Sequence, residues 1–337
     1  MDLVSIIIPV YNQEKFLEKS ISSALSQTYR NIQIVCVNDG STDASLRILE
    51  NFERSDHRII IVNQKNGGLA HAVTTGVKNA TGKYICFLDS DDFIGADFVQ
   101  NAMDEIGDSD FVAFGHYIDN ESTRYEKKIK ENLSLKSEKL EEIRNNLVWD
   151  KDAKVLASSV LNSRWNKLYK KSLIDKFIDK YDFCGRVSFG EDTIFTYLML
   201  KNATSGEGRR KTNSYYYNTG NQNSMMSSIN IDGHIKKAKD SMMMLSHLIL
   251  DEDGDVSQAY AMYFFLIESL FQRLEYDNDE DAFFSLYRIL RKDAYYRKAL
   301  NFLIDNSTKK RKVVFSLRKY IPSPRIYKLI FKMNKVL

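Results

Sequence analysis

Three carboxylates occur within four positions directly after an apolar segment of strand type. The segment is Tyr84–Leu88, and Asp89, Ser90, Asp91 and Asp92 follow it. Carboxylates this close together repel one another, and burying them without a partner is costly. A divalent cation removes that repulsion, and oxygen ligands of this kind suit magnesium or manganese. The alternative interpretation is an Asp-rich turn, in which Asp92 only starts the next helix.

Two other strand-like segments end in residues that suit a nucleotide. Val4–Ile8 leads through Pro9 to Tyr11, and Ile32–Val37 leads to Asp39. Pro9 has no amide hydrogen, so the strand ladder is expected to end there. Ligands of open α/β sheets bind beyond the carboxyl ends of the strands, where Tyr11 can stack on a base. Tyr11 can equally cover the core, whereas Asp39 is expected to accept hydrogen bonds from a base or a ribose.

A third polar segment, Asn66–Gly68, follows the apolar segment Ile59–Val62. Glycines before a helix let the backbone approach a ligand closely, and the first helix amides can face a phosphate. Glycines also form ordinary turns. This segment therefore indicates a phosphate site only in combination with the others.

Strand and helix patterns alternate through the first third of the chain. The strand-like segments are separated by segments with helical spacing, such as Phe16–Leu25 and Leu46–Phe52. This alternation predicts an α/β fold with a mostly parallel sheet and helices on both faces. Residues 119–148 are polar and predict a solvated helix or loop, Tyr215–Tyr217 predict a last strand, and helices are expected from Asp232 onward.

The charge distribution separates a C-terminal tail from the rest of the chain. Ten of the 48 Lys and Arg residues lie after Asp305, where no Asp or Glu occurs. Within this basic tail, residues 309–337, helical spacing relates Ile326, Leu329, Ile330 and Met333. A basic amphipathic helix suits an anionic membrane surface, and a helix packed on the protein body fits the pattern equally well. Nucleic acid is a poorer partner because the preceding sequence is acidic.

Composition and length set broad limits on the fold. The chain has 337 residues, of which 43% are hydrophobic and 12% aromatic, so a packed core is expected. No apolar segment approaches the roughly 18 residues that span a bilayer, and Met1–Val4 do not begin a signal peptide. We therefore expect a cytoplasmic protein, with membrane contact only at the inner surface through the tail. Cys36, Cys86 and Cys184 are expected to be reduced thiols rather than a disulfide or zinc site.

In order and spacing, these segments resemble the family 2 glycosyltransferases, which have the Rossmann-like GT-A fold. The matching segments are Ile8–Asn12, Asn38–Asp43, Asn66–Leu69, Phe87–Asp92, Trp165–Tyr169 and Gly190–Phe195. The resemblance implies a catalytic domain over residues 1–230, followed by a helical C-terminal region over residues 231–337. It also implies an inverting, metal-dependent transfer of a sugar from a UDP-sugar to a glycan or lipid-linked acceptor, as in bacterial surface-polysaccharide synthesis.

The resemblance also implies which residues hold the donor. Tyr11 and Asp39, with backbone near Pro9 and Val10, would hold the uracil. Further contacts to the nucleotide-sugar are expected from Asn66, Gly67 and Ser90. Asp91 is expected to bind Mn²⁺ or Mg²⁺, and Asp89 to bind either the metal or the ribose.

Catalysis is expected at Glu191-Asp192. The resemblance implies that Asp192 takes the proton of the acceptor hydroxyl, a poor nucleophile that needs a base within hydrogen-bond reach. Glu191 can bind the acceptor or replace Asp192 as the base. Acidic residues are also favoured at a helix start for structural reasons. Trp165 can stack on an acceptor sugar or belong to the core.

Two positions depart from the family pattern. Val73 and Asn218 stand where an arginine and a basic residue are usual, so a metal, Lys167 or the loop 218–228 would have to neutralise the phosphates. His71 is expected to be an ordinary histidine, and only position suggests a role for His234.

Two other functions fit parts of the sequence. A nucleotidyltransferase usually has a Gly-rich loop after the first strand, and Pro9–Phe16 contain no glycine. A non-catalytic carbohydrate-binding protein on the same fold would tolerate the loss of Asp91 or Asp192, and both residues are present.

Overall fold

The computed structural model describes residues 1–120, 123–151, 155–156, 159–183, 187, 189–220, 230–251 and 254–334. The chain divides into two compact units, Met1–Arg144 with Ser159–Ser227, and Asn145–Ser158 with Ser228–Leu337. Residues 145–158 were expected in the N-terminal domain. They belong to the second unit because Trp149 stacks on Phe265 and its indole N–H donates to the Asn306 carbonyl at 2.9 Å.

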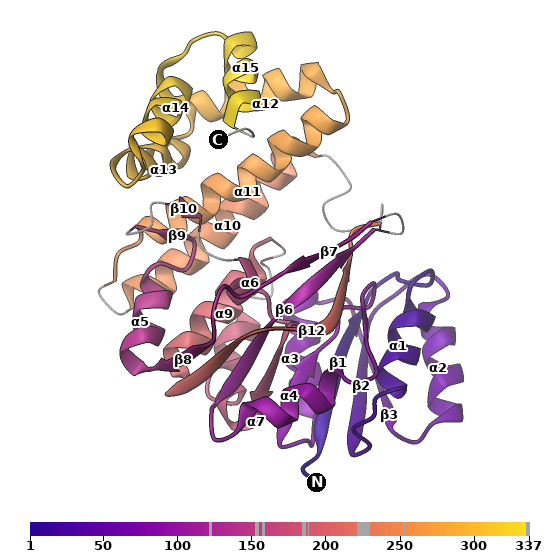
Figure 1. Ribbon diagram of the computed structural model, residues 1–337. Helices are drawn as coiled ribbons and strands as arrows, with labels where there is room; N and C mark the ends of the chain where they lie inside the picture. The colour runs from indigo at the N-terminus through magenta and orange to yellow at the C-terminus, as the bar shows by residue number, and fades with distance from the viewer. Residues whose placement is uncertain are drawn as a thin grey trace. The chain divides into compact units, whose positions relative to one another are not determined.

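A ten-stranded sheet forms the centre of the first unit (Figure 1). Its main path runs β3-β2-β1-β4-β11-β6-β12-β5, with β7 beside β6 and β8 beside β12. The strands are β1 (Val4–Val10), β2 (Ile32–Asp39), β3 (Ile59–Gln64), β4 (Tyr84–Phe87), β5 (Phe93–Ile94), β6 (Phe111–Asp119), β7 (Arg124–Lys127), β8 (Leu133–Lys136), β11 (Lys167–Lys170) and β12 (Ser205–Asn218).

The predicted α/β class is confirmed, but the complete sheet is mixed rather than mostly parallel. β1, β2, β3 and β4 are parallel, and β1, β2 and β4 are buried throughout, as is usual for strands covered on both faces. β11 then enters antiparallel between β4 and β6. β11 is too short for its sequence to show whether the strand runs parallel or antiparallel to its neighbours.

β1 continues through Pro9 to Val10, one residue beyond the end expected from the sequence. The β1–β4 pairing covers only Val4–Ile7, whereas the β1–β2 pairing continues to Val10. Pro9 therefore has a neighbouring strand on one side only, and a proline without an amide hydrogen is tolerated in such a position.

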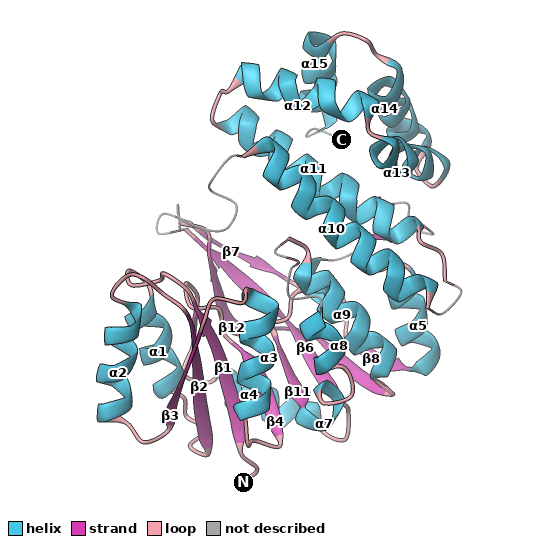
Figure 2. Ribbon diagram, turned by 180° about the vertical axis from the view of Figure 1, so that it is seen from behind, coloured by secondary structure: helices cyan, strands magenta, loops and turns pink. Residues whose placement is uncertain are grey.

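Helices cover both faces of the sheet (Figure 2). α3 lies on the face seen in Figure 2 and contacts β1 and β2, whereas α4 lies on the opposite face and contacts β6, β11 and β12. The helices of this unit are α1 (Leu17–Leu25), α2 (Ser45–Ser55), α3 (Leu69–Asn79), α4 (Phe98–Ile106), α5 (Ser137–Asn145), α6 (Ser159–Asn162), α7 (Lys171–Ile174), α8 (Ile178–Phe183) and α9 (Glu191–Asn202).

The polar segment 119–148 is more ordered than predicted. It contains β7, β8 and α5, and β12 extends far upstream of the predicted strand Tyr215–Tyr217. β7 pairs with β6, and β8 pairs with β12. Much of β7 and β8 faces solvent, so the apolar alternation that marks a half-buried strand is weak in their sequences.

The second unit is helical, as expected. It contains β9 (Trp149–Asp150), β10 (Val155–Leu156), α10 (Ile231–Leu250), α11 (Ser257–Tyr276), α12 (Glu280–Lys292), α13 (Ala294–Asp305), α14 (Lys309–Tyr320) and α15 (Pro324–Asn334). α10 and α11 each run for 20 residues, which the absence of proline from this part of the chain permits. None of the helices in the described residues is long and apolar enough to cross a membrane.

The basic tail forms α14 and α15, and each helix packs one face against the unit. Val314 and Phe315 of α14, and Tyr327, Ile330 and Phe331 of α15, are buried. The apolar residues that the sequence placed on one face of α15 are therefore divided, because Ile330 is in the core while Leu329 is 62% exposed. The side chain of Met333 lies outside the described residues, as does Cys184. Cys36 and Cys86 are buried free thiols, as predicted.

Candidate active site

The carboxyl ends of β1, β2 and β4 meet at one edge of the sheet because these strands are parallel neighbours. Tyr11 follows β1, Asp39 ends β2, and Asp89 lies just after β4. Tyr11 is 49% exposed, so its ring is accessible to a ligand at this edge. The structure thus brings the predicted nucleotide-binding residues of three separate segments together.

Asp39 organises the glycine turn. Its carboxylate accepts hydrogen bonds from the backbone N–H groups of Gly67 and Gly68 at 2.8 and 2.9 Å, and from Gln64 Nε2 at 2.7 Å. Gly68 has φ +89°, a conformation that favours glycine, and it precedes α3. Asp39 is only 3% exposed, so it positions this turn, a role that the sequence did not predict. Asn66 and Gly67 are exposed beside it.

Asp92 anchors the acidic turn to β12. It is buried and accepts hydrogen bonds from Tyr215 Oη at 2.7 Å and from the Asn218 N–H at 2.8 Å. Tyr215 also accepts from the N–H of Asp89 at 3.2 Å. The interpretation of Asp92 as a helix-start residue is wrong, since β5 follows it. Ser90 is also buried, whereas Asp89 and Asp91 are partly exposed.

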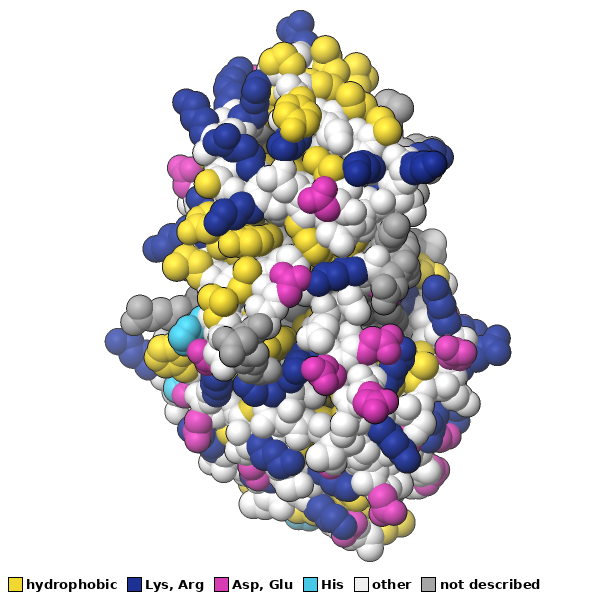
Figure 3. All heavy atoms as spheres, turned by 90° about the vertical axis from the view of Figure 1, so that its left-hand side faces the viewer, with side chains coloured by type: hydrophobic (Ala, Val, Ile, Leu, Met, Phe, Trp, Pro, Cys, Tyr) yellow, Lys and Arg dark blue, Asp and Glu magenta, His cyan; other side chains and the backbone are white. Residues whose placement is uncertain are grey.

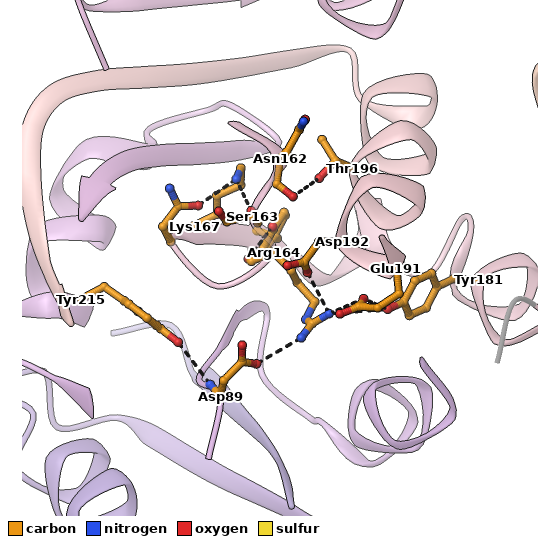
Figure 4. Close-up of polar contacts among 12 residues, drawn as sticks. Asp89, Asn162, Ser163, Arg164, Lys167, Tyr181, Glu191, Asp192, Thr196 and Tyr215 are labelled. Atoms are coloured by element: carbon orange, nitrogen blue, oxygen red, sulfur yellow. Dashed lines mark hydrogen bonds and ion pairs between the residues drawn. The ribbon is translucent and has the colours of Figure 1, made fainter. Parts of the chain in front are cut away.

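Arg164 joins the acidic turn to the predicted catalytic pair (Figure 4). Its Nη2 donates to Asp89 at 3.1 Å, and its Nη1 donates to Glu191 at 2.7 Å and to Asp192 at 3.1 Å. The Arg164 side chain is completely buried, and its guanidinium lies over the Phe87 ring at 5.4 Å. Arg164 was not among the predicted site residues, although its position directly before the Trp165–Tyr169 segment was an available signal.

Glu191 and Asp192 begin α9, directly after Gly190 at φ +68°. Tyr181 Oη donates to Glu191 at 2.6 Å, so Arg164 and Tyr181 together fix the Glu191 carboxylate. The Glu191 side chain is 9% exposed and the Asp192 side chain 34% exposed. Asp192 is therefore the member of the pair that is more accessible to an incoming hydroxyl.

The charges around Arg164 do not balance, because three carboxylates share one guanidinium. Burial, reinforced by nearby Glu191, raises the pKa of Asp192 to about 8, against the pull of Arg164. Burial and Asp91 likewise raise the pKa of Asp89 to about 6. Burial opposes the charge on Arg164, but the three carboxylates raise its pKa, so it remains protonated. The site favours an added proton or cation.

Trp165 and Lys167 lie in the core. Trp165 is 5% exposed, and its ring stacks on that of Tyr215 with 4.4 Å between the ring centroids. Of the two predicted roles, the core role therefore agrees with its position. Lys167 is fully buried and donates to Asn166 Oδ1 at 2.8 Å and to the Ser163 carbonyl. Burial lowers the pKa of Lys167 to about 7. Both side chains are buried in this structure, so they offer little or no surface to a ligand.

The acidic turn has the donor chemistry for a divalent cation. Among the described residues, no group of three or more His, Cys, Asp or Glu side chains is gathered to hold a metal by itself. Mg²⁺ at phosphate sites, however, is usually held by one or two carboxylates together with the phosphates. Asp89 and Asp91 are partly exposed, and their oxygens fit a cation that arrives with a nucleoside diphosphate.

The two departures from the family pattern have structural explanations. Val73 is fully buried in α3, so this position faces the core. Asn218 Nδ2 donates to the Asp91 carbonyl at 3.1 Å and thus holds the acidic turn. Most of the loop 218–228 lies outside the described residues. His71 Nδ1 lies 2.8 Å from Asp182, and His234 is buried in the second unit.

This sheet carries an acidic turn at its edge and an acidic pair on the other side of one arginine, which is the arrangement expected of a nucleotide-sugar transferase. Residues 5–177 match the family described as Glycosyl transferase family 2, and the chain belongs to this family.

Several known proteins are similar to parts or all of the chain. Glycosyltransferase GlyA of Streptococcus pneumoniae serotype 4 is 39% identical over 187 residues, which cover 52% of this chain and 25% of that protein. The glycosyltransferase EpsJ of Bacillus subtilis, described as uncharacterized, is 44% identical over 117 residues, 34% of each chain. The chain thus spans a quarter to a third of these two relatives.

The fold is shared with a solved structure over the whole chain. S. aureus TarS 1–349 in complex with UDP matches with a TM-score of 0.62 and 18% identity, over 100% of this chain and 92% of that one. The same protein has been solved in complex with UDP-GlcNAc. At this identity the similarity establishes the fold, which agrees with the predicted GT-A class.

Proposed function

We propose that this protein transfers a sugar from a nucleotide-sugar, a UDP-sugar, to a hydroxyl of a glycan or lipid-linked acceptor in cell-surface polysaccharide synthesis. One observation carries the proposal. Arg164 binds Asp89, from the predicted donor site, and Asp192, the predicted base, through adjacent nitrogens at 3.1 Å each. Two segments that are far apart in the sequence therefore flank one small region. The UDP complexes of the structural neighbour support the choice of donor.

The donor would bind along the edge formed by β1, β2 and β4. Tyr11 would stack on the base, with Pro9 and Val10 providing the underlying backbone. The exposed Asn66-Gly67 turn, which Asp39 holds in place, would approach the ribose or phosphates. This arrangement assigns Asp39 mainly to positioning the turn, and less to direct contact with the uracil.

The transfer would proceed by a single displacement. The acceptor oxygen attacks the anomeric carbon, the bond from that carbon to the diphosphate oxygen breaks, and UDP leaves with the bonding electron pair. Asp192 takes the hydroxyl proton, and the anomeric configuration inverts. Arg164 holds one oxygen of Asp192 and so orients the carboxylate, while Glu191, fixed by Tyr181, helps to raise the basicity of Asp192.

Asp91 and Asp89 would hold a Mn²⁺ or Mg²⁺ ion. When bound, such an ion neutralises the diphosphate and stabilises the leaving UDP. Lys167 is buried and Val73 replaces the family arginine, so this contribution would come from the ion or from the loop 218–228.

The test is a screen of nucleotide-sugars with manganese or magnesium, in which calorimetry measures donor binding and nucleotide release measures turnover. We expect one UDP-sugar to bind, and slow UDP release by hydrolysis or by transfer to an added acceptor. Binding of sugars without release would favour the non-catalytic carbohydrate-binding alternative. Release of pyrophosphate from a nucleoside triphosphate would favour a nucleotidyltransferase.

We also propose that the C-terminal unit contacts an anionic membrane surface through α14. Val313, Leu317 and Tyr320 are 58%, 42% and 68% exposed and recur at helical spacing. With Lys309 and Lys312 they line a shallow hollow of about 530 Å³. Figure 3 shows exposed hydrophobic side chains interspersed with Lys and Arg over this unit. Apolar and basic groups side by side suit the interface of an anionic bilayer.

Vesicle co-sedimentation tests this contact. We expect binding to phosphatidylglycerol vesicles that exceeds binding to phosphatidylcholine vesicles and weakens with salt. Leu317→Glu should reduce it. Leu250→Glu, at a position on α10 that is 59% exposed, is the control. Equal binding by wild type and Leu317→Glu would exclude α14 as the contact.

A further inference from the structure

Arg318 of α14 is a completely buried arginine with incomplete hydrogen bonding. Its Nη2 donates to both carboxylate oxygens of Glu268, at 2.9 and 2.7 Å. Its Nε and Nη1 have no hydrogen-bond partner among the residues that the structure describes. Burying a donor without a partner is unfavourable, so two such donors on one guanidinium indicate a missing acceptor.

Aromatic rings hold this guanidinium in one orientation. The rings of Phe264, Tyr327 and Phe331 lie 5.5, 5.1 and 5.2 Å from its central carbon. Tyr296 Oη donates to Glu268 at 3.3 Å and lies 2.7 Å from Tyr327 Oη, which fixes the carboxylate as well. Because the Arg318 side chain is already ordered, binding of a ligand costs little additional side-chain entropy.

Arg318 also lines a cavity of about 210 Å³ within the helical unit. Arg291, Arg297 and Lys319 line it too, and no acidic side chain does. None of these three has an ion-pair partner among the described residues. Glu268 therefore balances one of four cations, and the cavity retains a strong positive charge.

We propose that this cavity binds a phosphate group, either of a soluble phosphate ester or of a phospholipid headgroup. The planar guanidinium edge suits the oxygens of phosphate, and three uncompensated cations favour a dianion over a carboxylate. The volume equals several water molecules of about 30 Å³ each, which accommodates a phosphate with a small substituent. The site lies in the C-terminal unit, goes beyond the proposed transfer reaction, and is tested without turnover.

Titration calorimetry of the full chain with inorganic phosphate tests the site. We expect saturable binding that weakens at least about tenfold in Arg291→Ala/Arg297→Ala. Both side chains are exposed, so the fold should survive. Arg288→Ala removes an exposed cation from α12, the helix of Arg291, but not from the cavity, and should bind like wild type. No binding by wild type, or equal binding by the double variant, would overturn the proposal.

Arg318→Lys is a second variant, which keeps the charge beside Glu268 but removes the guanidinium edge. We expect phosphate affinity to fall while the circular dichroism spectrum stays unchanged. If this variant does not fold, the double variant still decides the question.

Two further titrations distinguish the sources of the phosphate. Competition by glycerol 3-phosphate without vesicle binding would identify a soluble ester. Binding to phosphatidic acid vesicles that Arg291→Ala/Arg297→Ala abolishes would identify a lipid headgroup. Failure of both probes would overturn the proposal, whatever the outcome for sugar transfer.

Discussion

Among the described residues, each of the two units contains one completely buried arginine side chain, and the two arginines have opposite surroundings. Three carboxylates surround Arg164, and both of its terminal nitrogens are bonded. Arg318 has one carboxylate, three aromatic rings and three further cations around its cavity. The first site has excess negative charge and suits proton transfer and a metal-bound donor. The second has excess positive charge and suits an anion. The partners of a buried charge, and not the charge itself, determine what it can bind.

Replacing each buried arginine should show the largest difference between the two sites, in the free energy of unfolding. Arg164→Met leaves three carboxylates together without their cation, so we expect a loss of about 3–5 kcal/mol in the free energy of unfolding and no transfer. Arg318→Met leaves only Glu268 unpaired, so the double variant Glu268→Gln/Arg318→Met should recover most of the stability. Urea unfolding measures both. Equal recovery by Glu191→Gln/Arg164→Met would contradict the charge imbalance at Arg164.

Neutralising the base should affect catalysis rather than binding. We expect Asp192→Asn to lower kcat by about 10²- to 10⁴-fold, because the acceptor hydroxyl then keeps its proton in the transition state. Donor affinity, measured by calorimetry, should change little. Glu191→Gln is the matched comparison, since it removes the neighbouring carboxylate from the same guanidinium. Turnover by Asp192→Asn together with inactive Glu191→Gln would assign the base to Glu191.

The same carboxylate should produce a dependence on pH. Burial and Glu191 raise the pKa of Asp192 to about 8, so kcat/KM should rise as the pH increases toward 8. Stability should change in the opposite direction to activity. The folded state retains a proton on Asp192 that the unfolded state loses near pH 4, so the contribution of this group to the unfolding free energy falls as the pH rises from about 4 to 8. Asp192→Asn should remove that part of the slope, and an activity limb below pH 5 would contradict the shift.

Of the four changes predicted here, removal of the metal should have the smallest effect. We expect Asp91→Asn, or a chelator with wild type, to weaken donor binding about tenfold, or about 1.4 kcal/mol. Phosphate binding at the Arg318 cavity should not respond to the chelator, which keeps the two sites distinct. Asp108→Asn, at an exposed position of the same unit, is the control. Unchanged donor affinity in Asp91→Asn would exclude Asp91 as a ligand.

Local patterns predicted much of the sheet edge that carries Tyr11, Asp39 and Asp89. The strands that end near Tyr11, Asp39 and Asp89 are apolar, β-branched segments followed by turn residues, and β1, β2 and β4 formed close to where these patterns stand. The short range of such signals also explains what they could not show. Trp165 and Lys167 match a family motif, but only packing shows that both side chains are buried.

Arg164 shows why the rest of the site could not be predicted. Its partners lie 75, 27 and 28 residues away, at Asp89, Glu191 and Asp192. No spacing rule relates these positions, since the segment after β4, the segment before β11 and the start of α9 come together only in the folded unit. Arg318 and Glu268 are likewise 50 residues apart. In the sequence Arg318 is one basic residue of a tail with ten.

The sequence by itself determined the fold class, the family resemblance and the acidic residues that are expected to do chemistry, because these depend on composition and on patterns within a few residues. Only the tertiary structure decided how charges are shared. Burial and long-range pairing assigned Asp39 to a turn and Asp92 to an anchor, and placed one arginine among acids and another beside a basic cavity. The energy of a charge depends on its solvent exposure and its neighbours, and a linear sequence contains neither.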